Sequence, residues 1–269
     1  MRPVGWNRYR KSWNGLIRRP TDTNSSGRTG QNTAMRDKPI KDALLRLLGG
    51  LGIDIVDRTG YSELEGLIRS LRPLDSGVKL IRLGPDGDGG YLLPDDLDGI
   101  EYAFSPGVST ESGFEADLAD TGLRVFLADY SVDRPAEMNT SFVFDKKFVG
   151  CLSNDMFITL DEWKNGTIPD YHDDLLLQMD IEGAEFEALF SMSAELLSQF
   201  RIMIIEFHYL QELLNKPYFT LSSRVFQKLL QTHSVVHIHP NNCCGSVKSR
   251  GLEIPRVAEF TFYRNDRLK

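Results

Sequence analysis

The chain has 269 residues, of which 31 are Lys or Arg and 38 are Asp or Glu, so its formal charge is −7. An apolar fraction of 41% with 10% aromatic residues excludes a disordered or fibrous protein. No apolar run reaches the 18 residues of a transmembrane helix. Residues 1–39 hold nine basic and two acidic side chains, whereas the rest of the chain holds 22 basic and 36 acidic ones. An acidic body argues against a nucleic-acid partner and favours a glycan or other small molecule.

Residues 1–38 are predicted to form a basic, disordered tail. Residues 21–33 are polar and rich in Gly and Ser, as in a flexible linker. The segment before them mixes Arg and Lys with Trp6 and Trp13 but lacks the apolar core of a secretion signal. A solvated tail is the favoured interpretation, and weak contact with an anionic membrane surface is the alternative.

The three cysteines, Cys151, Cys243 and Cys244, cannot form a disulfide framework. Two of them are adjacent, where a bridge would close a strained ring. We therefore expect a reducing, cytoplasmic location.

Helical patterns at residues 41–48 and 61–71 predict a helical preface or cap over residues 39–75. From residue 76 to the end, strands alternate with helices, and the strands at 175–179 and 202–205 are apolar throughout. Such strands are typical of an open, mostly parallel α/β sheet that is covered on both faces. The strands are predicted at 78–83, 90–93, 101–104, 124–128, 147–149, 175–179, 202–207, 235–238 and 259–263, and the helices at 111–119, 184–189 and 221–231.

Ligands of such sheets bind beyond the carboxyl ends of the strands. Gly107 and Val108 follow the strand at 101–104, where a glycine turn lets the backbone approach a ligand. The loop holds one glycine, so the GxGxxG fingerprint is not matched. Asp129 ends the next strand and is placed to accept hydrogen bonds from ribose hydroxyls. An ordinary turn and a solvated Asp are the alternatives, but the pair favours a nucleoside-containing cofactor.

Asp180 ends the apolar strand at 175–179, where an ionised group needs a reason. Contact with a cofactor, metal ligation or a general-base role would each supply one. Glu182 and Glu185 follow at the start of a helix, and the helix dipole alone explains their charge.

Glu206 and His208 lie two residues apart near the end of a strand, so both side chains point the same way. They suit a general base or two ligands of a divalent metal, and a structural hydrogen bond is the alternative. His237 and His239 also share a face and precede Asn241. Because no other ligands complete a zinc site, contact with the substrate or with other site residues is the better interpretation.

Several segments resemble the FkbM-type S-adenosylmethionine-dependent methyltransferases. The most specific is LLLQMDIEGAEFEAL at 175–189, which resembles the strand-four motif K-x-D-I/V-E-G-A-E of that family. TLDEW at 159–163, IIEFH at 204–208, GDGGY at 87–91 and the HIHPNNCCG segment at 237–245 are similar to other motifs of the family or of a subgroup. Two positions depart from the pattern, namely the single glycine of the first loop and Gln178 in place of the motif's Lys.

The resemblance implies a seven-stranded, Rossmann-like methyltransferase fold over residues 76–269 and O-methylation of a sugar, glycan or other small-molecule hydroxyl. A non-catalytic, decayed methyltransferase module and a nicotinamide-dependent oxidoreductase are the alternatives. By position, the resemblance implies that Gly107, Val108, Asp129 and Asp180 contact S-adenosylmethionine. Transfer to a hydroxyl also requires that its proton be removed, so we expect Asp180, Glu206 and His208 to be the catalytic residues and the candidate ligands of a Mg²⁺ ion. We expect His239 and Asn241 to contact the substrate.

Overall fold

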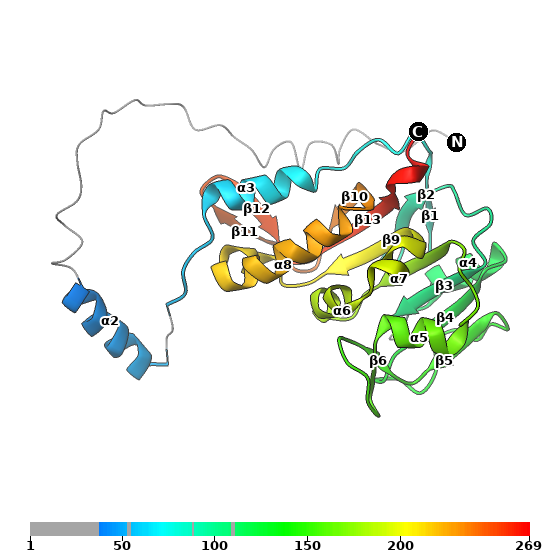
Figure 1. Ribbon diagram of the computed structural model, residues 1–269, viewed down its shortest axis with the longest axis horizontal. Coiled ribbons are helices and arrows are strands. Elements are labelled where there is room, and N and C mark those ends of the chain that lie inside the picture. The colour runs from blue at the N-terminus through cyan, green and yellow to red at the C-terminus, as the bar shows by residue number, and fades with distance from the viewer. Residues whose placement is uncertain (1–37, 53–54, 88, 109–110) are drawn as a thin grey trace.

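The computed structural model describes residues 38–52, 55–87, 89–108 and 111–269 (Figure 1). The predicted basic tail, residues 1–38, therefore lies outside the described residues apart from Lys38. Within the described ranges, no helix combines the length and the apolar character that a membrane crossing requires.

Seven strands form one sheet in the order β10-β13-β9-β8-β3-β4-β5. Neighbouring strands from β9 to β5 pair in parallel, whereas β13 is antiparallel to both of its neighbours. The predicted α/β fold with seven mostly parallel strands is confirmed. The strands are β3 Tyr102–Pro106, β4 Arg124–Ala128, β5 Phe142–Asp145, β8 Leu175–Met179, β9 Phe200–Phe207, β10 His233–Pro240 and β13 Ala258–Arg264.

Both faces of this sheet are covered, because its central strands are apolar on both sides. Every residue of β8 and of β9 is buried. One apolar cluster joins the sheet to helices α3 and α5 to α8, and a second joins the other face to α4 and a hairpin of β1 and β2. The helices are α2 Lys38–Gly50, α3 Tyr61–Ser70, α4 Gly113–Asp120, α5 Leu160–Thr167, α6 Glu185–Ser191, α7 Ala194–Gln199 and α8 Lys216–Leu229.

Three short two-stranded sheets lie outside the main sheet. The strand predicted at 147–149 belongs to one of them, and the edge of the main sheet is β5, which the sequence pattern missed. The apolar run in β5, residues 142–144, is shorter than the roughly four to eight residues that mark a buried strand, and all four residues of β5 are half-buried. The small sheets pair β1 Leu80–Leu83 with β2 Tyr91–Pro94, β6 Phe148–Val149 with β7 Phe157–Ile158, and β11 Ser246–Ser249 with β12 Leu252–Pro255, and the 3-10 helices are η1 Leu210–Leu214 and η2 Asn265–Arg267.

The chain reverses its direction of travel across the sheet between β3 and β8. From β3 it proceeds through β4 to β5, and it then returns to place β8 on the opposite side of β3, followed by β9. Ligands of open α/β sheets bind at such a topological switch point, beyond the carboxyl ends of the strands. The residues that follow β3 and β8 are therefore the first place to search for a site.

A histidine at the start of β10 predicts how the fold responds to acid. The His233 side chain is completely buried, its Nε2 lies 2.7 Å from the Phe200 carbonyl oxygen and its Nδ1 lies 2.8 Å from the Thr232 hydroxyl. Because a carbonyl only accepts, Nε2 carries a proton, and the Thr232 hydroxyl can donate to Nδ1 of a neutral ring. Burial lowers the pKa of His233 to about 4, well below its value in an unfolded chain, so its contribution to stability is present above about pH 6.5 and is lost as the pH falls toward 4.

We expect wild type to lose about 2–3 kcal/mol more unfolding free energy between pH 7 and pH 4.5 than the His233→Gln variant, which cannot titrate there. Urea unfolding at the two pH values measures the difference. The exposed His172, replaced by Gln, is the matched control and should behave as wild type. Equal acid losses in wild type and His233→Gln would contradict this account.

Candidate active site

Gly107 and Asp180 meet at the switch point. The Gly107 N–H donates to the Ala128 carbonyl (2.9 Å) and the Asp180 N–H donates to the Pro106 carbonyl (3.2 Å), which ties the ends of three strands together. Gly107 has φ +92°, and a Cβ there would lie 1.5 Å from the Asp180 carbonyl oxygen. Only glycine fits this position. Val108, which follows it, is 3% exposed and packs into the core.

Asp129 lies directly after β4, beside this junction. Its side chain is 6% exposed, and Oδ1 accepts hydrogen bonds from the Ser131 N–H (2.7 Å) and the Ser131 hydroxyl (2.6 Å). The carboxylate therefore shapes the turn that follows β4, and it lies at the same edge of the sheet as Gly107 and Asp180.

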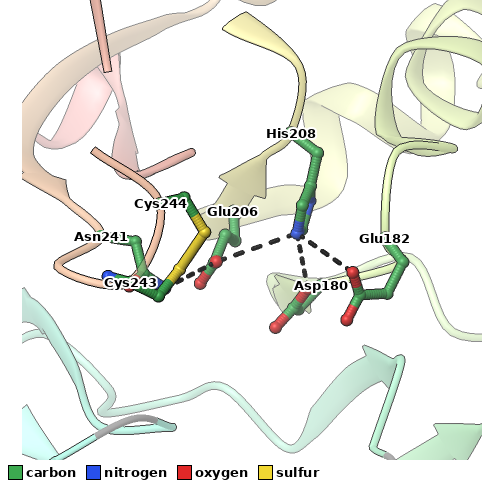
Figure 2. Close-up of a disulfide and its surroundings, with 7 residues drawn as sticks. All are labelled: Asp180, Glu182, Glu206, His208, Asn241, Cys243 and Cys244. Atoms are coloured by element: carbon green, nitrogen blue, oxygen red, sulfur yellow. Dashed lines mark hydrogen bonds and ion pairs between the residues drawn. A yellow bond between two sulfur atoms is a disulfide. The ribbon is translucent and has the colours of Figure 1, made fainter. Parts of the chain in front are cut away.

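His208 is the centre of a cluster of carboxylates at the ends of β8 and β9 (Figure 2). Its Nε2 lies 3.5 Å from Glu182 Oε2 and 3.9 Å from both Asp180 Oδ1 and Glu206 Oε1. Its Nδ1 lies 3.0 Å from Glu185 Oε1. The structure thus brings together the three predicted residues Asp180, Glu206 and His208, and it adds two that the sequence interpretation had set aside.

Glu185 is one of these additions. Its side chain is completely buried at the start of α6, and Oε1 accepts from the backbone N–H groups of Ile181 (3.2 Å) and Gly183 (3.0 Å) as well as facing His208. It therefore fixes both the turn after β8 and the orientation of the imidazole. In the sequence, Glu185 is the last residue of the DIEGAE motif, but the helix dipole alone explains an acidic residue at a helix start, so Glu185 was not predicted to be a site residue.

We expect Glu185→Ala to lower the unfolding free energy by about 2 kcal/mol, because it leaves two backbone donors and the His208 ring without their acceptor. Glu185→Gln keeps an acceptor oxygen and should cost clearly less. Urea unfolding of both variants measures the difference. If Ala and Gln were equally tolerated, Glu185 would not hold this turn.

The turn between β8 and α6 directs Glu182 back toward His208. Glu182 has φ +56°, which is rare for a residue with a side chain, and Gly183 has φ +111°. A Cβ at Gly183 would lie 2.3 Å from the Tyr209 ring. Glu182 is 89% exposed, yet its carboxylate reaches the cluster because of this backbone conformation.

Asn241 joins the cluster from the loop after β10. Its Nδ2 donates to Glu206 Oε1 (3.0 Å), and its Oδ1 accepts from the Cys243 N–H (3.0 Å). Figure 2 shows the Cys243–Cys244 disulfide beside it. The expectation that the adjacent cysteines stay unbridged is wrong, since the loop after β10 accommodates a bond between their sulfur atoms. Cys151 is an exposed thiol, and His239 lies half-buried on β10, paired with Glu259 of β13.

Comparison with known proteins identifies the central part of the chain. Residues 120–232 match the model of the methyltransferase FkbM domain. The predicted family resemblance is confirmed for this segment. It contains Asp129, Asp180, Glu206 and His208, whereas Gly107, Val108, His239 and Asn241 lie outside it. No curated protein matches the chain.

Similar solved structures include crystal structures of two mutants of the 16S rRNA (adenine(1408)-N(1))-methyltransferase from Catenulisporales acidiphilia. Each is 11% identical to this chain and aligns over 98% of its own length, with 68% and 69% of this chain covered and TM-scores of 0.31 and 0.32. At scores this low the fold assignment rests on the strand order of the sheet and on the FkbM match, which together support a methyltransferase.

The cluster around His208 is rich in negative charge. Burial, with Glu206 adding to it, raises the pKa of Asp180. Burial alone would lower the pKa of His208, but the hydrogen bond to Glu185 and the surrounding carboxylates outweigh it and raise that pKa. Asp180 Oδ1 and Glu185 Oε2 are buried and accept no hydrogen bond. The arrangement can therefore take up a proton or a cation.

The sequence analysis predicted Asp180, Glu206 and His208 as metal ligands, and the structure groups a slightly different set of ligand atoms. Among the described residues, Asp180, Glu182 and His208 offer ligand atoms that all lie within 4.8 Å of one another. Glu206 stands beside them with its Oε1 held by Asn241.

Proposed function

We propose that the protein is an S-adenosylmethionine-dependent methyltransferase that methylates a hydroxyl oxygen of a sugar, glycan or other small molecule. The observation that carries this proposal is the carboxylate–histidine cluster at the switch point of a sheet whose central segment matches the FkbM domain. Residues 76–269 would form the methyltransferase domain, and 39–75 a cap whose helix α3 packs Leu64, Leu67 and Ile68 into the core.

The proposed cofactor contacts are Gly107, Val108, Asp129 and Asp180. Gly107 supports this set, because it lies where β3 and β8 meet and carries no side chain that would keep a ligand away from the backbone. Asp129, at the end of the adjacent strand, is suited to the ribose hydroxyls of the adenosine. Asp180 would then face the methionine end of the cofactor, where the methyl group is.

Methyl transfer is an in-line displacement that the protein accelerates by alignment. The acceptor oxygen forms a bond to the methyl carbon as the carbon–sulfur bond breaks, S-adenosylhomocysteine leaves, and the hydroxyl proton must go to the protein. We propose that the cluster of Asp180, Glu206 and His208 receives it. His208, positioned by Glu185, would offset the negative charge that gathers there.

The acceptor would contact His239 and Asn241, and Asn241 is hydrogen-bonded to Glu206. We propose a neutral small molecule or glycan, with no nucleic acid, because beyond residue 39 the chain carries 36 acidic and 22 basic side chains. We also propose a cytoplasmic location, since within the described part of the chain the one disulfide joins neighbours and staples no distant segments.

Incubation of the full chain with methyl-labelled S-adenosylmethionine and a panel of sugars, glycans and small alcohols tests this function. We expect base-stable label in at least one hydroxyl acceptor, together with release of S-adenosylhomocysteine. Label in amines alone would contradict O-methylation. If the protein binds the cofactor but labels no acceptor of the panel and none in cell extracts, the decayed-module alternative would be favoured.

A further inference from the structure

We propose that Asp180, Glu182 and His208 form a binding site for a divalent transition-metal cation, with Glu206 standing beside it. The cation's part in methyl transfer rests on the proposed function, whereas the site itself rests only on the geometry described below.

The ligand atoms are spaced for a single ion. His208 Nε2 lies 3.9 Å from Asp180 Oδ1 and 3.5 Å from Glu182 Oε2, and one ligand atom from each residue falls within 4.8 Å of the others. Atoms that bind one ion at about 2.1 Å each lie about 3–4 Å from one another. The three side chains therefore need only small movements to close on a cation, and Figure 2 shows them converging.

His208 is held as metal-binding histidines are held. Its Nδ1 faces a carboxylate, Glu185, that is completely buried and anchored by two backbone N–H groups. Because Glu185 Oε1 is an acceptor, Nδ1 carries a proton. A cation that displaces the proton from Nε2 would meet a lone pair directed at Asp180 and Glu182. A carboxylate that fixes the far nitrogen of a metal-binding imidazole is the usual arrangement at such sites.

Two buried oxygens in this cluster lack a partner. Asp180 Oδ1, directed at Nε2, and Glu185 Oε2, on a side chain with no exposed surface, accept no hydrogen bond. Buried polar atoms almost always find a partner. Four carboxylates, those of Asp180, Glu182, Glu185 and Glu206, surround a single imidazole. A cation would supply a partner for Asp180 Oδ1 and the missing positive charge.

The ligand set selects the kind of cation. Two carboxylates with one imidazole suit Mn²⁺, Fe²⁺ or Zn²⁺, whereas Mg²⁺ prefers oxygen ligands alone and keeps most of its waters. Three protein ligands leave coordination positions open. An acceptor hydroxyl bound there would lose its proton more readily. Glu206, oriented by Asn241 and 3.9 Å from His208 Nε2, is a carboxylate outside the ligand set that would receive the proton.

Titration of the metal-stripped full chain with Mn²⁺, followed by electron paramagnetic resonance, tests the site without any turnover. We expect one bound Mn²⁺ per chain in wild type and binding at least about 10-fold weaker in Asp180→Asn and His208→Ala. Zn²⁺ should displace the bound Mn²⁺, and Mg²⁺ at equal concentration should not. The exposed His172, replaced by Ala, is the matched control and should bind as wild type.

Glu182→Gln keeps the test decisive if the other variants fail to fold, because Glu182 is 89% exposed and its substitution leaves the core intact. Undiminished Mn²⁺ binding in folded Glu182→Gln and His208→Ala would overturn the site, as would a folded wild type that binds no Mn²⁺. Binding of S-adenosylhomocysteine is measured on the same wild-type sample. Cofactor binding without Mn²⁺ binding overturns the metal site and leaves the proposed function standing. Mn²⁺ binding without cofactor binding supports the metal site and contradicts the proposed function.

Discussion

Asp180→Asn is expected to lower kcat for methyl transfer by at least about 100-fold while leaving the affinity for S-adenosylhomocysteine within a few-fold of wild type. Asparagine has nearly the shape of aspartate but cannot accept a proton or balance a cation, and positioned proton acceptors contribute about 10²–10⁴ in rate. The backbone contacts of Asp180 to Pro106 and Gly107 are made by main-chain atoms, so the substitution should leave the junction intact.

Asp120→Asn is the matched control, since Asp120 is an exposed carboxylate at the end of α4. Steady-state kinetics and calorimetry on wild type and the two variants measure the effect. Full turnover in Asp180→Asn would remove Asp180 from the reaction. A loss of cofactor affinity with unchanged kcat would leave Asp180 as a cofactor contact without a part in the chemical step.

Gly107→Ala is expected to weaken binding of S-adenosylhomocysteine by at least about 100-fold and to lower the unfolding free energy by about 2 kcal/mol or more. The new Cβ would lie 1.5 Å from the Asp180 carbonyl oxygen, which is a severe clash, so β3 and β8 must separate at the switch point. The positive φ adds a strain of about 1 kcal/mol for any L residue.

Gly122→Ala separates the two causes, because Gly122 has a similar φ of +99° but open space around its Cβ position. It should carry the conformational strain alone and keep cofactor binding. Calorimetry and thermal unfolding of the three proteins give the comparison. Equal behaviour of the two Ala variants would show that the close approach to Asp180 has no functional consequence.

The sheet was largely predictable because its central strands are apolar on both faces. Every residue of β8 and of β9 is buried, and the alternation of strands and helices predicted that such strands form a mostly parallel sheet. Strand β5 was missed because an edge strand of four half-buried residues has no such signature. Strands β1, β2 and β6 of the smaller sheets were predicted, whereas β7, β11 and β12 were missed. Strands of two to four residues depend on tertiary packing, which no local pattern reports.

The site residues were predictable where an ionisable side chain ends an otherwise apolar strand. Asp180 and the Glu206–His208 pair end apolar strands, and the structure brings all three together. Glu185 was missed because a simpler explanation for an acid at a helix start was at hand. Glu182 was missed because its approach to His208 depends on a positive φ that the sequence does not encode in a glycine.

Asn241 shows a different limit. A contact with the substrate stays a prediction, and the sequence did not reveal that its side chain bonds to Glu206 and to the Cys243 N–H. Contacts between segments 35 residues apart depend on how β9 and β10 are joined through β13, and spacing along the chain does not contain that information.

Binding of S-adenosylhomocysteine, measured by calorimetry on wild type, Asp129→Ala and Ser131→Ala, tests the central claim most directly. Ser131→Ala removes the hydroxyl that bonds to Asp129 Oδ1 but keeps the carboxylate, so it controls for damage to the turn after β4. The account predicts micromolar binding by wild type and Ser131→Ala, and at least about 10-fold weaker binding by Asp129→Ala. A folded wild type that binds no S-adenosylhomocysteine would contradict it, and the roles assigned to Gly107, Asp129 and Asp180 would fall together.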